Sequence, residues 1–243
     1  MNQREWLTSC LLSASEELSE EFLCHVNGRG LPHRLMVDMG VGGGDSYAYE
    51  ESMEETFRDR HGTTGQNLQD HISIPLWTPR GVLAGAEWRR WDGDKGVAKY
   101  FLPNSKWEPV FTGMTPGVLK KISKGADVWL VEGIFDMSLY HFVPEKDVVL
   151  ACGGAKITSN QVNFLSRFMR KRSMVHVCFD MDQTGRNMAY GYLHPDTGKR
   201  IWGVGEKLSF SGVTNRVVQY SGGKDPGEIW EKGGKRALGI AFG

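Results

Sequence analysis

Cysteine is scarce in this sequence, and none of the four residues is spaced as a C-x-x-C pair. Pairs of that kind usually mark a zinc site or a redox site, so we expect neither from these residues. The cysteines are Cys10, Cys24, Cys152 and Cys178, and we expect reduced thiols, as is usual in the cytosol.

Net charge and long apolar runs are missing as well. The 29 lysines and arginines balance 29 acids, so no global basic field indicates a nucleic-acid partner, and such a site would need local clustering. No run approaches the roughly 18 apolar residues of a membrane span, and the N-terminus lacks the basic start of a secretory signal. We therefore expect a soluble cytoplasmic protein with no membrane partner, large enough at 243 residues to bury a real core.

The glycine-rich segment GVGGGD, residues 40–45, does not have the G-K-[ST] ending of a phosphate-binding P-loop. We interpret it as a flexible turn. It lies within an N-terminal half, residues 1–122, whose start has helical spacing from Trp6 to Phe22 and which has a short charged helix at 50–61. Turns at TPRG and DGDKG then separate three short strands of a small antiparallel unit, over residues 71–77, 82–91 and 97–102.

The second half, residues 123–243, alternates strands with helices. Continuous apolar strands between helices are typical of a parallel sheet covered on both faces. The predicted fold class is therefore α/β (α+β overall), with a small mixed subdomain before the parallel sheet. The expected strands are DVWLVE (127–132), DVVLACGG (147–154), SMVHVCFDMD (173–182) and NRVVQY (215–220), with helices at 135–143, 159–172, 184–193 and 225–237.

Acids follow the ends of three of these strands. Ligands bind beyond the carboxyl ends of parallel strands, and the second strand ends in a G-G turn that permits close approach. A single acid in such a place is usually a helix cap or a solvated residue, and Asp182 before QTGRN fits a cap. Four acids at one edge instead favour a hard cation, Mg²⁺ or Mn²⁺. The acids are Glu132, Asp180, Asp182 and Asp225.

The pair Asp180 and Asp182 raises a question of charge. Side chains at i and i+2 leave an extended backbone on the same face, and like charges about 4 Å apart repel by roughly 4 kcal/mol at an effective dielectric near 20. Solvent, an arginine or a divalent cation would offset this repulsion. No basic residue stands directly beside the pair in the sequence, which favours the cation. Two such ions would support phosphoryl transfer, whether a bond is made or cut.

These motifs resemble a Toprim domain, the metal-binding fold shared by bacterial-type primases, topoisomerases and some nucleases. The motifs are LVEGIFDM, the G-G turn, CFDMDQTGRNMA and GGKDPGEIW, and the D-x-D-x-x-G-R-x-x-A spacing is most similar to the primase branch. The resemblance implies a metal ligand or general base at Glu132 and metal ligands at Asp180, Asp182 and Asp225. It also matches Asp136 to an acid of the first motif, a possible metal or second-shell residue.

The N-terminal half is similar to the same branch in the order of its motifs. FLCHVNGRGLPHRLMVDMGVG looks like the primase opening around an R-G-L, and the segment from ISIPLW to AKYFLPNS looks like the part that holds template and nucleotide. The match covers roughly residues 20–236. It implies nucleotide or template contacts for Arg89 and Lys99. Lys156, after the G-G turn, either reaches a triphosphate or is a solvated lysine at a helix start.

The sequence also departs from the family pattern. The second acid often found two residues after the position of Asp225 is replaced by Gly227, with Glu228 beside it, which puts the second ion in doubt. We expect no zinc ribbon before the core, since C-x-x-C pairs are missing, and no helicase-binding region after it. We therefore expect a minimal polymerase core of the kind encoded by a phage or mobile element, acting in a bacterial host cytoplasm. A separate zinc-bearing or recognition subunit would then select the template.

The resemblance implies a DNA-dependent RNA primase that uses single-stranded DNA, NTPs and an RNA primer with Mg²⁺ or Mn²⁺, and that works beside a replicative helicase. A Toprim nuclease would use the same acids without NTPs. A non-catalytic nucleic-acid-binding replication protein with a decayed metal site is the third hypothesis, which Gly227 keeps open. The basic run Arg167, Arg170, Lys171 and Arg172 is either a solvated helix end or a phosphate contact.

Overall fold

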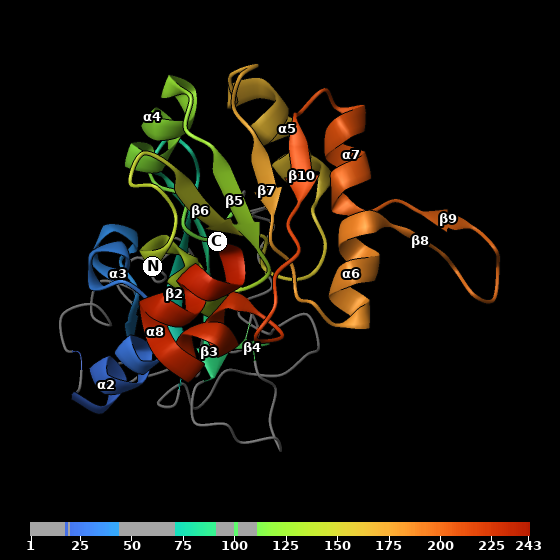
Figure 1. Cartoon of the computed structure of the whole chain (residues 1–243). Helices are drawn as coiled ribbons and strands as arrows, with labels where there is room; N and C mark the ends of the chain where they lie inside the picture. Colours follow the sequence, from blue (N-terminus) through green and yellow to red (C-terminus); the bar gives the residue numbers. More distant parts are fainter. Residues whose placement is uncertain (1–17, 19, 44–70, 91–99, 102–110) are drawn as a thin grey trace, which may run out of the picture.

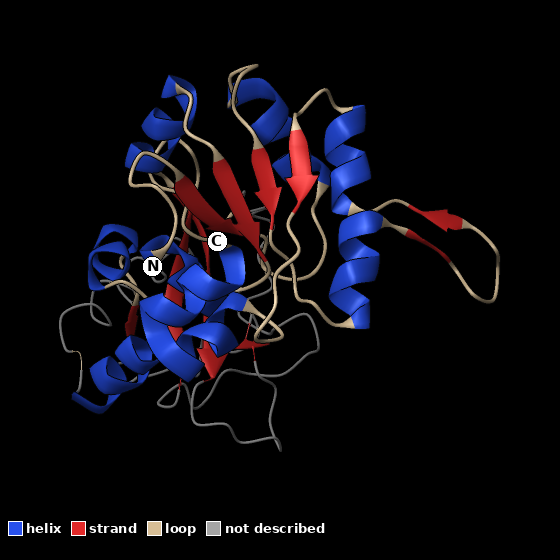
Figure 2. Ribbon diagram, in the orientation of Figure 1, coloured by secondary structure: helices blue, strands red, loops and turns tan. Residues whose placement is uncertain are grey.

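The structure is a computed structural model that describes residues 18, 20–43, 71–90, 100–101 and 111–243. Within these residues the chain forms an antiparallel sheet, a parallel sheet and a small hairpin (Figures 1 and 2). The predicted helices near the start of the chain and at 50–61 lie wholly or mostly outside the described residues. No helix in the described part is both long and apolar enough to cross a membrane.

The antiparallel sheet has the order β1-β2-β3-β4, and two short helices precede it in the chain. It confirms the predicted antiparallel unit. The pairing of β2 with β3 places Ile72 opposite Arg89. The elements are α2 (Glu20–Gly28), α3 (His33–Met39), β1 (Gly42–Gly43), β2 (His71–Trp77), β3 (Leu83–Arg90) and β4 (Tyr100–Phe101).

The second sheet is wholly parallel, as predicted, with the order β10-β7-β5-β6. All four carboxyl ends therefore meet at one edge, which Figure 1 shows as the edge of the arrowheads. The strands are β5 (Val128–Val131), β6 (Val148–Ala151), β7 (Val175–Val177) and β10 (Asn215–Val217).

Among the described elements, four helices cover one face of the parallel sheet, and two of them have clear sequence signals at their starts. Thr115 caps the first of them and Pro116 follows at its first position. Thr158 and Gln161 form a capping box at the start of the second. The helices are α4 (Pro116–Lys124), α5 (Ser159–Phe168), α6 (Gln183–Tyr190) and α7 (Val204–Phe210).

Alternating side chains of the parallel strands enter two hydrophobic cores. Val128 and Leu130 of β5 pack with α4, α5 and α7, whereas Trp129 and Val131 pack on the opposite face. That opposite face is covered by η2 (Ile134–His141) and α8 (Pro226–Phe242), together with apolar residues of α2, α3 and β2. The two halves thus share a core, and the expected division after residue 122 stays a prediction.

Several elements differ from the predictions. Residues 135–143 were expected to form an α-helix, but η2 is a 3-10 helix, a narrower coil whose residues 134–139 are all buried between the sheet and α8. α5 ends at Phe168 because Met169 is extended. α6 ends at Tyr190, after which β8 (Tyr192–Leu193) and β9 (Arg200–Ile201) form a projecting hairpin. α8 continues past residue 237, although Gly233 and Gly234 interrupt it.

Candidate metal and nucleotide site

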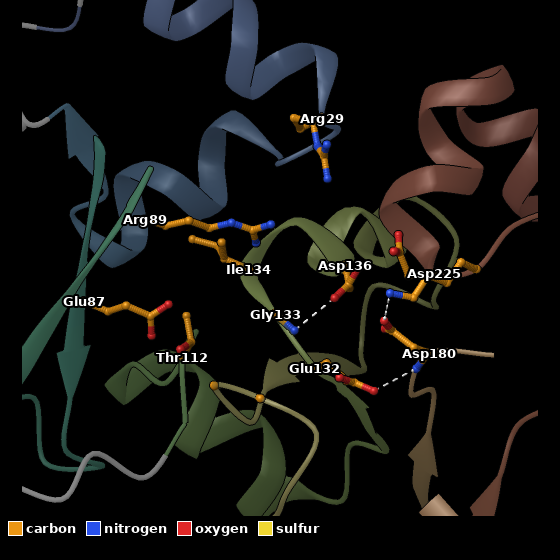
Figure 3. Close-up of a pocket in the computed structure, with 13 residues that line it drawn as sticks. Arg29, Glu87, Arg89, Thr112, Glu132, Gly133, Ile134, Asp136, Asp180 and Asp225 are labelled. Atoms are coloured by element: carbon orange, nitrogen blue, oxygen red, sulfur yellow. Dashed lines mark hydrogen bonds and ion pairs between the residues drawn. The ribbon is translucent and has the colours of Figure 1, made fainter. Parts of the chain in front are cut away.

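A pocket of about 370 Å³ lies at the carboxyl edge of the parallel sheet. Glu132 follows β5, Asp180 follows β7 and Asp225 follows β10, so connectivity alone brings these acids to one edge. Figure 3 shows four carboxylates along one side of the pocket, while two arginines and the carboxylate of Glu87 reach in from other sides. The pocket is lined by Arg29, Glu87, Arg89, Thr112, Glu132, Gly133, Ile134, Asp136, Gly153, Gly154, Asp180, Lys224 and Asp225.

Glu132 points toward Asp180. Its Oε1 accepts a hydrogen bond of 3.1 Å from the backbone N–H of Asp180. The pKa of Glu132 is raised to about 7, mainly by burial and in addition by the negative charge of Asp180. A carboxyl group whose pKa is near 7 is suited to exchange a proton or to bind a cation at neutral pH.

Asp136 lies deeper in the same pocket. Its Oδ2 accepts a 2.9 Å hydrogen bond from the N–H of Gly133, which holds the carboxylate at the start of η2. Its side chain is buried, and this burial raises its pKa to about 7, with further contributions from the charges of Asp225 and Asp180. Asp136 is therefore part of the acid cluster by position, although its role as a ligand stays a prediction.

Lys224 offsets the repulsion between the carboxylates of Asp180 and Asp182. Its Nζ lies 3.0 Å from Oδ2 of Asp180 and 3.1 Å from Oδ2 of Asp182. No basic residue stands beside the pair in the sequence, but the fold brings Lys224 to it from the loop after β10, a neighbour that sequence reasoning did not consider. The two carboxylates raise the pKa of Lys224. Burial still raises the pKa of Asp180 against the opposing effect of the lysine.

Two of the predicted ligands are also helix caps. Asp182 Oδ1 accepts the N–H of Gly185 at 2.8 Å at the start of α6, and this hydrogen bond lowers the pKa of Asp182. Asp225 Oδ1 accepts the N–H of Glu228 at 2.7 Å at the start of α8. The other carboxylate oxygen of Asp182 is the one that pairs with Lys224, and Asp182 is not among the residues that line the pocket.

The donor set fits a hard cation. Carboxylate oxygens are the ligands that Mg²⁺ and Mn²⁺ prefer. The pKa values of Glu132 and Asp136 are raised mainly by burial, and the negative charges of neighbouring acids act in the same direction. Among the described residues, no group of three acid, histidine or cysteine side chains lies close enough together to coordinate one ion. Gly227 also lies beside the cluster, since a Cβ there would be 3.3 Å from Asp225 Oδ1 and 3.4 Å from Asp136 Oδ1.

Two arginines, Arg29 and Arg89, line the pocket opposite the acids that follow the strands. The guanidinium of Arg89 lies 4.2 Å from the centre of the Phe135 ring, and that of Arg29 lies 4.6 Å from it. An ion pair of 2.6 Å to Glu231 also holds Arg29. Arg89 was predicted to contact nucleotide or template. Arg29 was not singled out, although the R-G-L segment at residues 29–31 contained the signal.

The remaining basic candidates are placed differently. Lys99 lies outside the described residues. Lys156 is exposed and does not line the pocket, so a triphosphate contact there stays a prediction. Arg167, Arg170 and the two basic residues that follow lie at or beyond the C-terminal end of α5, at the opposite edge of the parallel sheet.

Residues 129–230 match the family described as Toprim-like. The chain is also 30% identical over 171 residues to the DNA primase of Aquifex aeolicus, which covers 69% of this chain and 31% of that protein. The chain thus spans about a third of the length of this curated relative.

Solved structures show the same fold across the chain. The zinc-binding and RNA polymerase domains of the Aquifex aeolicus primase match with a TM-score of 0.65 at 22% identity, over 99% of this chain and 62% of that one. A DnaG primase catalytic domain bound to single-stranded DNA matches with a TM-score of 0.59 at 16% identity, over 98% of this chain and 79% of that one. The Toprim domain and the primase-core fold predicted from the sequence are thereby confirmed.

Proposed function

The chain has a Toprim-like domain within the fold of the primase catalytic core, and from this premise we propose that it is a DNA primase core that makes short RNA primers on single-stranded DNA. The observation that supports the proposal best is the division of one pocket into two kinds of charge. Glu132, Asp136, Asp180 and Asp225 contribute acid, with Lys224 beside Asp180. Arg29 and Arg89 contribute base, and Glu87 also lines the pocket on the side of Arg89 (Figure 3). A nucleotidyl transfer site needs both, for cations and for the phosphates of an NTP.

In the proposed reaction, the 3′-hydroxyl of the primer attacks the α-phosphate of an NTP, and pyrophosphate leaves. Arg29 and Arg89 would bind the triphosphate, since guanidinium groups suit phosphate geometry. Glu132 would accept the hydroxyl proton. Mg²⁺ or Mn²⁺ ions held by Glu132, Asp180 and Asp225 would neutralise phosphoryl charge and acidify the attacking hydroxyl.

Template binding is proposed for the groove between the acid edge and the antiparallel sheet. Arg89 of β3 lines this groove, and the similar DnaG catalytic domain solved with single-stranded DNA supports DNA as the partner. We also propose a contact with a replicative helicase, and a separate zinc-bearing or recognition subunit. Lys99 is included as a template contact by the family match alone.

A Toprim nuclease and a non-catalytic binder remain the alternatives to test. One reaction separates all three: single-stranded DNA, labelled NTPs and Mg²⁺ or Mn²⁺. Short RNA products are expected. Shortened DNA without NTP incorporation would instead indicate a nuclease, and DNA retention with no turnover would indicate a binder.

The Asp180→Ala variant controls this assay. It should abolish dinucleotide synthesis while leaving the fold intact, because the side chain accepts no backbone hydrogen bond that the fold needs. Asp196→Ala, an exposed acid in the hairpin, should retain full synthesis. Normal synthesis by Asp180→Ala would reject the assigned metal site.

A further inference from the structure

A second concentration of charge lies at the edge of the parallel sheet opposite the carboxylates. The end of α4 leads into β5, and the segment after α5 leads into β7, so both bring residues to the amino ends of the strands (Figure 1). All of the side chains concerned are exposed. This basic rim consists of Lys120, Lys121, Lys124, Arg170, Lys171 and Arg172.

The rim is one continuous surface built from separate parts of the chain. Arg170 Nε donates a 2.8 Å hydrogen bond to the carbonyl of Ser123, which joins the end of α5 to the end of α4. On the other side, Lys121 Nζ donates to the carbonyl of Glu145 at 2.7 Å. The two basic segments therefore lie side by side although they are 47 residues apart at the Arg170–Ser123 bond.

The charge of the rim is not neutralised within the described residues, where none of its six side chains forms an ion pair. Helix dipoles favour cations near helix C-termini, but Lys171 and Arg172 lie beyond the end of α5 at Phe168. The whole chain has a net charge of zero. The six cations of the rim outnumber three acids that also lie at this edge, Asp127, Glu145 and Asp147.

We propose that the basic rim binds the phosphates of single-stranded DNA, as a second contact for the strand that enters the pocket. The choice of DNA as the polyanion rests on the proposed function. The six side chains supply charge without aromatic rings, so they would contact the backbone and not read the bases. The rim lies a strand length or more from the carboxylates, so DNA must span at least that distance to contact both surfaces.

The test compares two triple variants with equal loss of charge. The rim variant combines Lys124→Gln, Lys171→Gln and Arg172→Gln, and leaves Lys121 and Arg170 intact because their hydrogen bonds join neighbouring segments. The control variant combines Lys199→Gln, Arg200→Gln and Arg236→Gln, three exposed cations outside the pocket that Lys121 of the rim lines. Fluorescence anisotropy measures the affinity of each protein for DNA of about 3 and about 40 nucleotides, lengths below and above a typical single-strand site.

For the long DNA, the rim variant should bind about tenfold more weakly near 0.1 M salt, and the slope of log affinity against log salt should fall by about 2, which is about 0.7 for each of three lost contacts. The control variant should bind like the wild type. The short DNA should bind equally to all three proteins. A variant with Lys124→Arg and Lys171→Arg should keep the wild-type affinity.

Equal losses in the rim and control variants would overturn the proposal, as would a rim effect that is as large for the short DNA. Acidic proteins would then be the partner class to examine. Primer synthesis on a short template separates this result from the proposed function, since the rim variant should synthesise primers normally there. If the wild-type chain makes no primers but the rim variant still loses affinity for long DNA alone, the proposed primase function is refuted and the proposal for the rim stands.

Discussion

The ammonium group of Lys224 explains how two neighbouring aspartates are tolerated at the end of a buried strand. It lies within 3.1 Å of a carboxylate oxygen of both Asp180 and Asp182. Lys224 is half-exposed, so the side chain has room to leave this position. A lysine held there competes with any divalent cation for the same oxygen atoms.

Replacing Lys224 with glutamine should strengthen Mn²⁺ binding about three- to tenfold, since it removes a competing charge from a partly exposed site. Isothermal titration in the absence of nucleotide measures this affinity. Lys232→Gln is the matched control, because Lys232 pairs with Glu228 outside the pocket and its loss should leave the affinity unchanged. Weaker Mn²⁺ binding by Lys224→Gln would contradict this role.

Asp136 and Glu132 make the stability of the chain depend on pH in a defined direction. Their folded-state pKa values are raised from 3.8 and 4.5 to about 7. Between these limits the folded state binds protons that the unfolded state has released, so stability falls as pH rises to about 7. The penalty arises from carboxylates that ionise in a buried, acidic site.

The substitution Asp136→Asn should therefore raise the melting temperature at pH 8 by about 2 to 6 °C without divalent cations, and the gain should vanish toward pH 4. Asparagine keeps an oxygen for the N–H of Gly133. Calorimetry at the two pH values measures the difference. Asp182→Asn should give the opposite sign at pH 8, because the pKa of Asp182 is lowered in the folded state. A gain from Asp136→Asn that does not depend on pH would disprove the explanation.

Among the elements, the parallel strands were the most predictable. Their apolar runs are continuous because both faces are buried, and the acids and glycines that follow mark the carboxyl ends. α4 was missed although Thr115 and Pro116 mark its start, and α7 has only seven residues. β8 and β9 were missed because a two-residue strand has no measurable period. The 3-10 form of η2 depends on tertiary packing on all sides, which local spacing does not encode.

The close packing of the Asp180 backbone against the start of α6 requires a glycine at position 185. A Cβ at Gly185 would lie 2.2 Å from the carbonyl oxygen of Asp180, and the N–H of Gly185 holds Asp182. Backbone cannot move away as a flexible side chain would. The D-x-D-x-x-G spacing is therefore a steric requirement for placing both acids.

Gly185→Ala should lower primer synthesis at least 100-fold and cost about 2 kcal/mol or more of stability, because the loop that carries both aspartates must shift. Gly239→Ala in α8 is the control, since a Cβ there meets nothing within 4 Å. Synthesis assays and thermal unfolding measure the two effects. Equal behaviour of the two alanine variants would show that the close approach does not matter.

At the scale of the whole molecule, the loop after α2 is docked against the Toprim half. The carbonyl of Gly30 lies 3.1 Å from Nε2 of His141, whose ring stacks on Trp230 at 4.2 Å. Beside it, Arg29 pairs with Glu231 of α8. These contacts place a residue of the N-terminal half at a pocket whose acids come from the C-terminal half. Sequence reasoning placed the acids, because connectivity fixes them, but Arg29 and Lys224 depend on how distant segments meet.

Gly30→Ala should disturb this docking, since Gly30 has a φ of +74° and a Cβ there would lie 2.5 Å from the Trp230 ring. We expect a fall of several degrees in melting temperature and a rise in KM for NTP about threefold or more, because Arg29 moves with its neighbour. Gly28→Ala, where a Cβ meets nothing within 4 Å, should change neither quantity. An unchanged KM in a destabilised Gly30→Ala protein would remove Arg29 from nucleotide binding.

The central claim is that acids from three strand ends together bind a divalent cation. Titration with Mn²⁺, followed by the electron paramagnetic resonance of the free ion, tests it on the wild-type chain and on Asp180→Asn. The account predicts saturable uptake by the wild type and loss of most of that uptake in the variant. Uptake that is absent in the wild type, or equal in the two proteins, would contradict it.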